Sequence, residues 1–301
     1  MEKGLLLWLI AAFYQSLAVE ALTLDSAKNF RPIRVNGKDS YQFYRAAALD
    51  DLSNKDAEAL MNVEVVVMDL RNADEIASKI KKRTEASVKF YQHVEASSSQ
   101  SRLVHVPILQ DVDAFWDEAI VRMDPLDRFW ATMQTVTSAG ALDRAAARKM
   151  EDEGLSMLYT VTLATAKRKL RTALDICASA EGPVIFHCQK GKDRTGLVAM
   201  LLQSCLGSSD EEIVKTYAES GPLLGETVAS ESSPDNRTSG TFIDWSRFRG
   251  SPSEAMEDTM DWIKRRYGSV EKYIETELGL GGDYVDRLRN NHQQSPSAVL
   301  G

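Results

Sequence analysis

Short apolar runs alternate with helical periodicities along this chain. Four of the runs predict buried strands, at residues 40–46, 64–70, 103–108 and 184–187. Between them, Ser53 is suited to cap a short helix, and residues 113–180 contain several helical stretches, the last near 158–178. Strands separated by helices form a mostly parallel sheet with helices on both faces. We therefore expect an α/β fold with its binding site at the carboxyl end of a strand.

Helical signals continue beyond the fourth strand. Residues 195–205 form an apolar stretch that Gly207 ends. Ser208 and Ser209 are each followed three residues later by a glutamate, which is the pattern of a capping box. One of these serines is expected to begin the next helix.

Residues 225–250 interrupt this regularity. They are rich in Ser, Thr, Gly and charged residues and have little periodicity, which predicts a mobile insertion beside the binding site. Trp245 and Phe248 lie in it. They either contact an aromatic ligand or pin the insertion to the core, and both roles stay open.

Composition indicates one large folded domain. The chain has 301 residues, of which 44% are hydrophobic and 27% charged. Its net charge of −8 argues against nucleic acid as a partner, because phosphate backbones require clustered Lys and Arg. No run of eighteen apolar residues occurs, so no transmembrane span is expected.

The first 21 residues have the features of a secretory signal peptide. A lysine near the start precedes an apolar run at residues 5–13, and Val19 and Ala21 are small residues at the two cleavage-defining positions. The alternative is an amphipathic helix packed on the domain. We expect the folded domain to cover residues 22–295, with a tail at 296–301. The location is the secretory pathway if the segment is a signal peptide, and otherwise the cytoplasm.

The most informative stretch is residues 183–197, PVIFHCQKGKDRTGL, in which an apolar strand leads into a charged loop and then a helix. Loop amides above a helix N-terminus form a cradle for a phosphate dianion. The same amides, the helix dipole and Arg194 favour the thiolate of Cys188. Cys188 is therefore the expected nucleophile, and Arg194 can bind two phosphate oxygens with its planar fork.

Each of the other loop residues has an expected part in binding phosphate or in supporting the loop. Thr195 can donate its hydroxyl to the Cys188 sulfur, and His187 orients the loop through backbone hydrogen bonds. Gly191 permits unusual dihedral angles and a close approach of the amides. Lys190 and Lys192 form a positive mouth together with Arg194. The expected phosphate-binding positions are Gln189, Lys190, Gly191, Lys192 and Gly196.

No metal or other cofactor is expected. Arg194 and the loop amides supply the charge stabilisation that a metal ion gives elsewhere. The four histidines are scattered, and neither they nor the cysteines have metal-ligand spacing.

The loop string HCQKGKDRTG resembles the cysteine-dependent protein-tyrosine and dual-specificity phosphatase superfamily, most closely its tyrosine/lipid phosphatase branch. The resemblance extends over residues 29–290. The further segments that carry it are 29–31, 44–46, 65–71 with Glu75, 104–108, 217–220 and 267–273. It implies a phosphatase fold and a cysteinyl-phosphate intermediate.

The resemblance also implies the remaining site residues. In this branch the loop aspartate, here Asp193, is proposed as the general acid. Asp111 and Asp113 compete for that role, because they follow the strand ending near residue 108. Family positions with an expected supporting role are Arg45, Asp69 and Arg71, and the last two can pair at the sheet end.

Three hypotheses about function stay open, of which two differ in the substrate and the third has no catalysis. Protein phosphotyrosine is the favoured substrate; a deep pocket would admit only its long ring, and the sequence does not give the depth of the pocket. Phosphoinositides are the alternative, because Lys190 and Lys192 could hold further phosphates. A third hypothesis is a phosphate-binding module without turnover.

Overall fold

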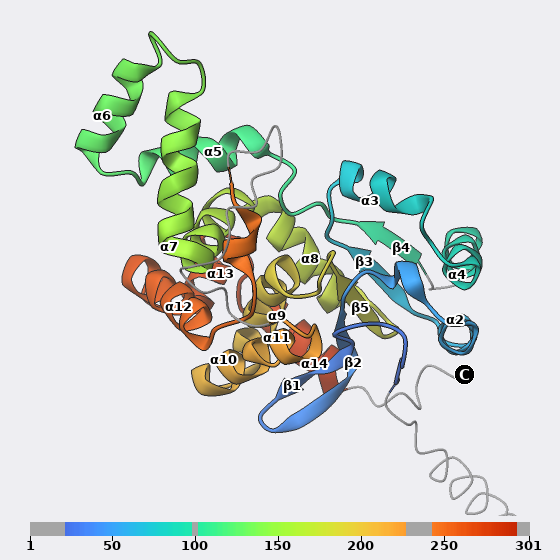
Figure 1. Ribbon diagram of the computed structural model, residues 1–301. Coiled ribbons are helices and arrows are strands. Elements are labelled where there is room, and N and C mark those ends of the chain that lie inside the picture. The colour runs from blue at the N-terminus through green and yellow to red at the C-terminus, as the bar shows by residue number, and fades with distance from the viewer. Residues whose placement is uncertain (1–21, 98–101, 227–242, 294–301) are drawn as a thin grey trace, which may run out of the picture.

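The computed structural model describes residues 22–97, 102–226 and 243–293, and within them the core is a five-stranded sheet (Figure 1). The strands are β1 (Arg31–Val35), β2 (Lys38–Ala46), β3 (Val66–Asp69), β4 (Arg102–His105) and β5 (Val184–His187). Their spatial order is β1-β2-β5-β3-β4. All neighbours run parallel except β1, which pairs with β2 in an antiparallel hairpin. The expected α/β fold with a mostly parallel sheet is confirmed.

Strand β1 is the strand of the sheet that the hydrophobic pattern did not predict. Its sequence, RPIRV, contains a proline and two arginines, and its register with β2 is irregular between Pro32 and Arg34. Proline is tolerated at such edge positions because an edge strand does not need every backbone donor. The strand is identified by its pairing with β2 rather than by apolar content.

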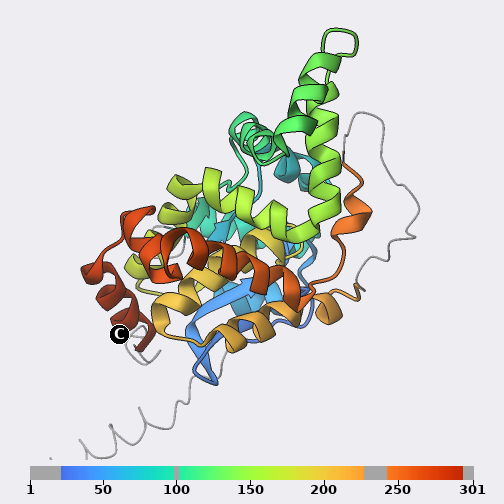
Figure 2. The same cartoon turned by 90° about the vertical axis from the view of Figure 1, so that its left-hand side faces the viewer.

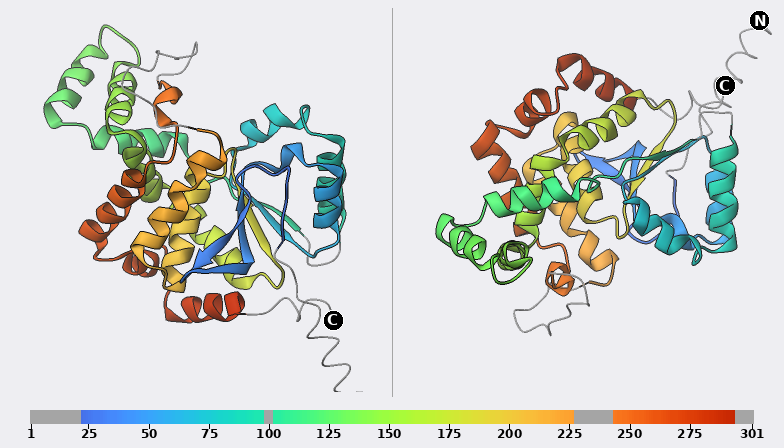
Figure 3. Two further views of the ribbon diagram at one scale, coloured as in Figure 1. Left: turned by 60° about the horizontal axis from the view of Figure 1, so that its bottom comes forward. Right: turned by 90° about the horizontal axis from the view of Figure 1, so that it is seen from above.

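The sheet has an apolar layer on each face, because side chains alternate along its strands. Tyr44, Val67 and Ile185 pack with α2 (Asn54–Met61) and α4 (Glu85–Ala96) on one face. Phe43, Met68 and Phe186 belong to the larger core of the opposite face. Figure 3 shows the sheet between these two layers.

The larger layer contains most of the remaining helices. They are α5 (Val112–Val121), α6 (Pro125–Gln134), α7 (Ala141–Thr165), α8 (Lys167–Ser179), α9 (Asp193–Leu206), α10 (Asp210–Ala218), α12 (Ser253–Tyr267), α13 (Val270–Thr276) and α14 (Gly282–Gln293). The short α3 (Ala73–Ile80) follows β3, and α11 (Ser220–Leu223) follows α10. The 3₁₀ turns are η1 (Leu49–Asp51) and η2 (Trp245–Phe248).

Helix ends follow the sequence signals. The Ser53 side chain accepts a hydrogen bond from the Asp56 amide at the start of α2, and Ser209 does the same for Glu212 at the start of α10. Gly207 ends α9 in the left-handed conformation, with φ of 87°. The single helix predicted near 158–178 is wrong, because the chain leaves helical geometry at Ala166, between α7 and α8.

Helix α7 is kinked, and the kink separates two structural roles. Gly154 has non-helical backbone angles, φ 64° and ψ −143°, which glycine adopts without a Cβ clash. The segment before the kink forms, with α6, a hairpin that stands away from the sheet (Figure 2). The segment after the kink packs on the core and carries Leu158, Tyr159 and Thr162 to the site described below.

Several sequence predictions fall on parts of the chain outside the described residues. They are the signal segment at 1–21, most of the insertion, at 227–242, and the tail at 296–301. Within the described part, no helix has both the length and the apolar character needed to cross a membrane.

Candidate active site

A pocket of about 400 Å³ lies at the carboxyl end of β5, where the chain turns into α9. Five of the predicted site residues line it, namely Cys188, Gln189, Lys190, Asp193 and Arg194. Leu109 from the segment after β4, Leu158 from α7 and Phe248 from η2 add apolar wall. Cys188 is only 2% exposed, so a reacting group must enter the pocket to meet its sulfur.

Two arginines place positive charge near Cys188. Burial lowers the pKa of Arg45 to about 10, and the negative charge of Cys188 is the largest of the influences that oppose this change. Burial also acts to lower the pKa of Arg194, but the hydrogen bond to Glu75 and the charges of Cys188, Glu75 and Asp193 outweigh it and raise that pKa. Both guanidinium groups therefore interact with the charge of the Cys188 side chain.

The Arg194 guanidinium is held by a bidentate pair with Glu75. Its Nη1 and Nη2 lie 2.5 and 2.7 Å from the two carboxylate oxygens. Glu75 is fixed in turn at the start of α3, where it accepts a hydrogen bond from the Asn72 amide in a capping box. Since a guanidinium has five N–H donors, the Nε–H and the second proton of Nη2 remain for phosphate oxygens.

Asp193 is oriented by a pair of tyrosines. The Tyr159 hydroxyl donates to Asp193 Oδ1 at 2.7 Å, and the Tyr217 hydroxyl lies 2.7 Å from the same Tyr159 oxygen. Burial, together with the charge of Asp193, raises the pKa of Tyr159 well above its usual value, so Tyr159 stays protonated and donates. Asp193 lines the same pocket as Cys188.

The competing carboxylates lie in a different cavity. Asp111 and Asp113 line a pocket bounded by the start of α5 and the α7–α8 junction, and Cys188 is not among its lining residues. Asp111 caps α5 by accepting a hydrogen bond from the Ala114 amide. This placement favours Asp193 over both as the acid.

Lys192 does not line the mouth of the pocket, which corrects the sequence prediction. Its side chain is about 1% exposed, and its Nζ donates to the carbonyl oxygens of Phe248 and Gly250, at 2.7 Å each. Buried ammonium groups need such acceptors. Lys192 therefore ties η2 to the catalytic loop, and Lys190, paired with Glu226 at 2.5 Å, remains at the pocket.

Two further loop positions differ from expectation. Thr195 is fully buried, and its hydroxyl has no hydrogen-bond partner among the described residues, so the predicted bond to the Cys188 sulfur is not made. The Gly196 amide donates to the Lys192 carbonyl within α9 and is therefore not directed at phosphate. A side chain at Gly196 would crowd the Tyr217 ring, with the nearest ring carbon at 3.2 Å, so this glycine serves helix packing.

The loop is supported from below by side chains that bind its carbonyl groups. Arg45 Nη2 donates to the Gly191 carbonyl at 2.8 Å. Asn29 Nδ2 donates to the carbonyls of Lys190 and Gly191, at 3.0 and 2.9 Å. Gly191 has φ of 67°, and a Cβ there would overlap the Ala46 carbonyl. With the Lys190 and Gly191 carbonyls bound to these supports, the loop can present its amides to an anion.

Asp69 and Arg71 form the pairing predicted at the sheet end. Arg71 is fully buried; its Nη2 lies 2.7 Å from Asp69 Oδ2 and its Nη1 lies 2.6 Å from Asp50 Oδ2. Burial acts to raise the pKa of Asp69, but the His187 ring, when protonated, and the hydrogen bonds and charge of Arg71 lower it. Because burial lowers the pKa of His187 and keeps its ring neutral, Arg71 is the effective partner.

His187 connects this cluster to the loop. Its ring Nδ1 lies 3.4 Å from the Cys188 carbonyl oxygen, and its own carbonyl accepts from the Leu70 amide at 2.8 Å. Cys188, the residue that follows β5, is thereby fixed relative to β3. This arrangement agrees with an orienting role for His187.

Several residues of the site had no role assigned from the sequence, among them Asn29, Glu75, Tyr159 and Tyr217. Asn29, Glu75 and Tyr217 lie in segments that carry the family resemblance, and that signal could have identified them. Tyr159 lies in an apolar helical stretch, and only the fold shows that it reaches Asp193.

Three known proteins and one family model resemble this chain. The model of the tyrosine phosphatase family matches residues 22–293. The triple specificity protein phosphatase PtpB of Mycobacterium tuberculosis is 24% identical over 281 residues, which cover 88% of this chain and 92% of that protein. A tyrosine-protein phosphatase of Nostoc commune is 29% identical over 124 residues, covering 38% of this chain and 40% of that protein. A putative tyrosine-protein phosphatase of Cupriavidus necator is 49% identical over 112 residues, covering 36% and 39%. The matched part is thus less than half the length of the last two relatives.

Proposed function

Because the chain belongs to the tyrosine phosphatase family, we propose that it hydrolyses phosphomonoesters, above all phosphotyrosine in proteins, through a cysteinyl-phosphate intermediate. The observation that carries this proposal is the pocket that Cys188, Asp193 and Arg194 share. A nucleophile, a proton donor and a charge-stabilising fork are the groups that phosphoryl transfer to a thiolate requires.

The proposed reaction has two steps. In the first, the Cys188 sulfur attacks phosphorus, the P–O ester bond breaks, and the proton of Asp193 goes to the leaving phenolate. In the second, water attacks phosphorus, the S–P bond breaks, and Asp193 takes the proton of water as orthophosphate forms. Arg194 and the loop amides bind the equatorial oxygens throughout.

The pocket walls favour an aromatic ester. Leu109, Leu158 and Leu197 line it, together with Phe248 and the half-exposed Trp245. A phenyl ring buries apolar area against such walls, and aromatic pairs contribute roughly 1 kcal/mol beyond that burial. The exposed Trp245 is placed to contact a ligand, whereas the buried Phe248 is placed to anchor the insertion. Each of the two roles left open by the sequence thus has one residue that fits it.

The phosphoinositide alternative has less support. It relied on Lys190 and Lys192 as cations for additional phosphates, but Lys192 is buried and its ammonium donates to two carbonyls. Lys190 is paired with Glu226. An inositol ring with several phosphates would also meet mainly apolar wall.

A panel of substrates tests the proposal. Phosphate release from purified, reduced protein would be measured on a phosphotyrosine peptide, the matching phosphoserine peptide and phosphoinositides in mixed micelles. We expect kcat/KM for the phosphotyrosine peptide to exceed that for either alternative by about tenfold or more, the discrimination that a fitted apolar pocket can supply. Equal or higher kcat/KM on the lipid would contradict this assignment.

Replacing Asp193 by asparagine should expose its role as the acid. We expect kcat on phosphotyrosine to fall by about 10² to 10⁴-fold, because a phenolate with a pKa of about 10 leaves poorly without a proton. Hydrolysis of p-nitrophenyl phosphate should fall much less, since nitrophenolate leaves unprotonated. The measurement is the ratio of kcat on the two substrates.

Asp111→Asn is the matched control. It makes the same change at a carboxylate that caps α5 outside the pocket, and the ratio of kcat on the two substrates should remain that of the wild type. If Asp193→Asn retained the wild-type rate on phosphotyrosine while Asp111→Asn lost it, the acid would be Asp111.

A further inference from the structure

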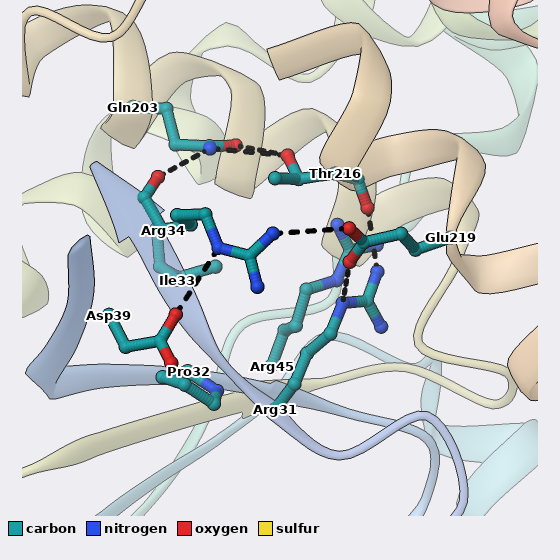
Figure 4. A pocket seen from close by; sticks show the side chains of 9 residues that line it. All are labelled: Arg31, Pro32, Ile33, Arg34, Asp39, Arg45, Gln203, Thr216 and Glu219. Atoms are coloured by element: carbon teal, nitrogen blue, oxygen red, sulfur yellow. Dashed lines mark hydrogen bonds and ion pairs between the residues drawn. The ribbon is translucent and has the colours of Figure 1, made fainter. Parts of the chain in front are cut away.

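A second polar cavity lies behind the catalytic loop. It measures about 250 Å³ and shares no lining residue with the Cys188 pocket. Three arginines enter it from two strands, Arg31 and Arg34 from β1 and Arg45 from β2. Gln203 of α9 and Thr216 of α10 close the opposite side (Figure 4).

The cavity has more positive than negative charge. Its three guanidinium groups face two carboxylates, Glu219 and Asp39, and Asp39 is half-exposed. Glu219 pairs with Arg34 at 3.3 Å and with Arg31 at 3.6 Å, and Figure 4 shows the arginine side chains converging around it. The three guanidinium groups thus outnumber the two carboxylates that line the cavity.

Arg45 adds an unused donor to this cavity. The residue is 2% exposed, and its Nε–H has no acceptor among the described residues. A buried guanidinium donor without an acceptor is costly, and an anion in the cavity would remove that cost. Burial lowers the pKa of Arg31 to about 8; the charges of Arg45 and Arg34 add to this change, and Glu219 opposes it.

The same arginines contact the catalytic loop. Arg45 Nη2 donates to the Gly191 carbonyl at 2.8 Å. Arg31 Nη1 donates to the Asn29 carbonyl at 3.2 Å, and Asn29 holds the Lys190 and Gly191 carbonyls. Two short hydrogen-bonded routes thus join the cavity to the loop that carries Cys188.

We propose that this cavity is a second binding site, for a phosphate-type dianion, and that its occupancy acts on the catalytic loop from behind through Arg45 and Arg31. The cavity has room for roughly eight water volumes of about 30 Å³ each, which is enough for one phosphate group and a few waters. Arg31 already donates to Asn29, Thr216 and Ser220, so Arg34 and Arg45 would supply the donors that phosphate oxygens prefer. By linkage, an anion that binds here and an anion in the Cys188 pocket change each other's affinity by the same factor.

Equilibrium dialysis with radiolabelled inorganic phosphate tests the site by counting bound ions, independently of turnover. We expect two phosphates per wild-type chain and one in Arg34→Gln, which removes a cavity donor that does not touch the catalytic loop. Arg168→Gln makes the same charge change on the exposed face of α8 and should keep two. One phosphate in the wild type, or two in Arg34→Gln, would overturn the proposal.

A second variant separates binding from a merely structural effect. Glu219→Gln removes the carboxylate that competes for Arg31 and Arg34, so phosphate should bind the second site more tightly, by about fivefold. A loosened structure would weaken it instead. Repeating the dialysis with phenylphosphonate distinguishes the source of the anion. If one phenylphosphonate binds per chain, the cavity accepts only the free ion. If two phenylphosphonates bind, the cavity also accepts a phosphorylated molecule.

The effect on the loop is read from phosphate inhibition kinetics. Phosphate that binds only in the Cys188 pocket is a competitive inhibitor and leaves kcat unchanged. We expect it to change kcat at saturating substrate by about fivefold in the wild type and to become purely competitive in Arg34→Gln. Purely competitive inhibition of a wild type that binds two phosphates would remove the coupling to the loop.

Discussion

Replacing Cys188 by serine should lower phosphate release from a phosphotyrosine peptide by at least about 10⁴-fold, while the peptide still binds. A thiol ionises far more readily than a hydroxyl, and the thiolate is the nucleophile. Serine has nearly the same shape, so Arg194, Asp193 and the loop amides remain in place to hold the phosphate. The measurements are kcat by phosphate release and Kd by titration with the phosphopeptide.

The other two thiols provide a matched control. Cys177 and Cys205 are buried, and burial raises the pKa of each thiol to about 12. The charge of Cys205 adds to the effect on Cys177, and the charge of Glu271 adds to the effect on Cys205. Neither lines the pocket, so Cys205→Ser should retain the wild-type kcat while the fold is intact. In the wild type, iodoacetamide near neutral pH should alkylate Cys188 before either of them. Undiminished hydrolysis by Cys188→Ser would remove the proposed mechanism.

The elements next to the catalytic loop were predictable because their signals are local. Strand β5 is a fully buried apolar run, and its observed limits coincide with the prediction. Helix α9 ends at Gly207, where positive φ favours glycine. The order of strands and helices likewise indicated the parallel sheet, because parallel strands require crossover helices. These features depend on residues within a few positions of one another.

Side-chain directions in the site were not predictable, because distant segments decide them. Lys192 resembles any surface lysine in sequence, but the carbonyls that bury its ammonium belong to residues 56 and 58 positions further along. The partner of Arg194 is Glu75, which is 119 positions away. The cap of α3 places Glu75 there, and only the adjacency of β3 and β5 brings the two together.

Strand β1 and Tyr159 are two further cases in which the local sequence pattern does not predict what the residues contact. The arginines of β1 break its apolar pattern, but both line the second cavity, and Arg31 also binds Asn29, which supports the loop. Tyr159 lies in a helical stretch that reads as core, and its hydroxyl meets Asp193 only because α7 kinks at Gly154. In both cases contacts with distant segments decide the position of the side chain, and the local pattern does not contain them.

Replacing Arg194 by lysine should lower kcat on phosphotyrosine by about 10³-fold although the charge is kept. A lysine ammonium is a single point charge, so it cannot hold the Glu75 carboxylate through two donors and also present a fork to two phosphate oxygens. The loss belongs to the transition state, where charge builds on those oxygens, and kcat should therefore fall more than KM rises. Steady-state kinetics on one phosphotyrosine peptide measure both.

The companion variant Glu75→Gln isolates the orienting part of this effect. It removes the charge of the Arg194 partner but keeps an oxygen that can accept one of the two hydrogen bonds, so Arg194 stays in the pocket with a less fixed fork. We expect kcat to fall by only about tenfold, since the guanidinium itself remains to meet the phosphate. If Arg194→Lys instead matched the wild type in kcat/KM while Glu75→Gln lost activity, then charge alone would suffice at residue 194, and Glu75 would act on the reaction by another route.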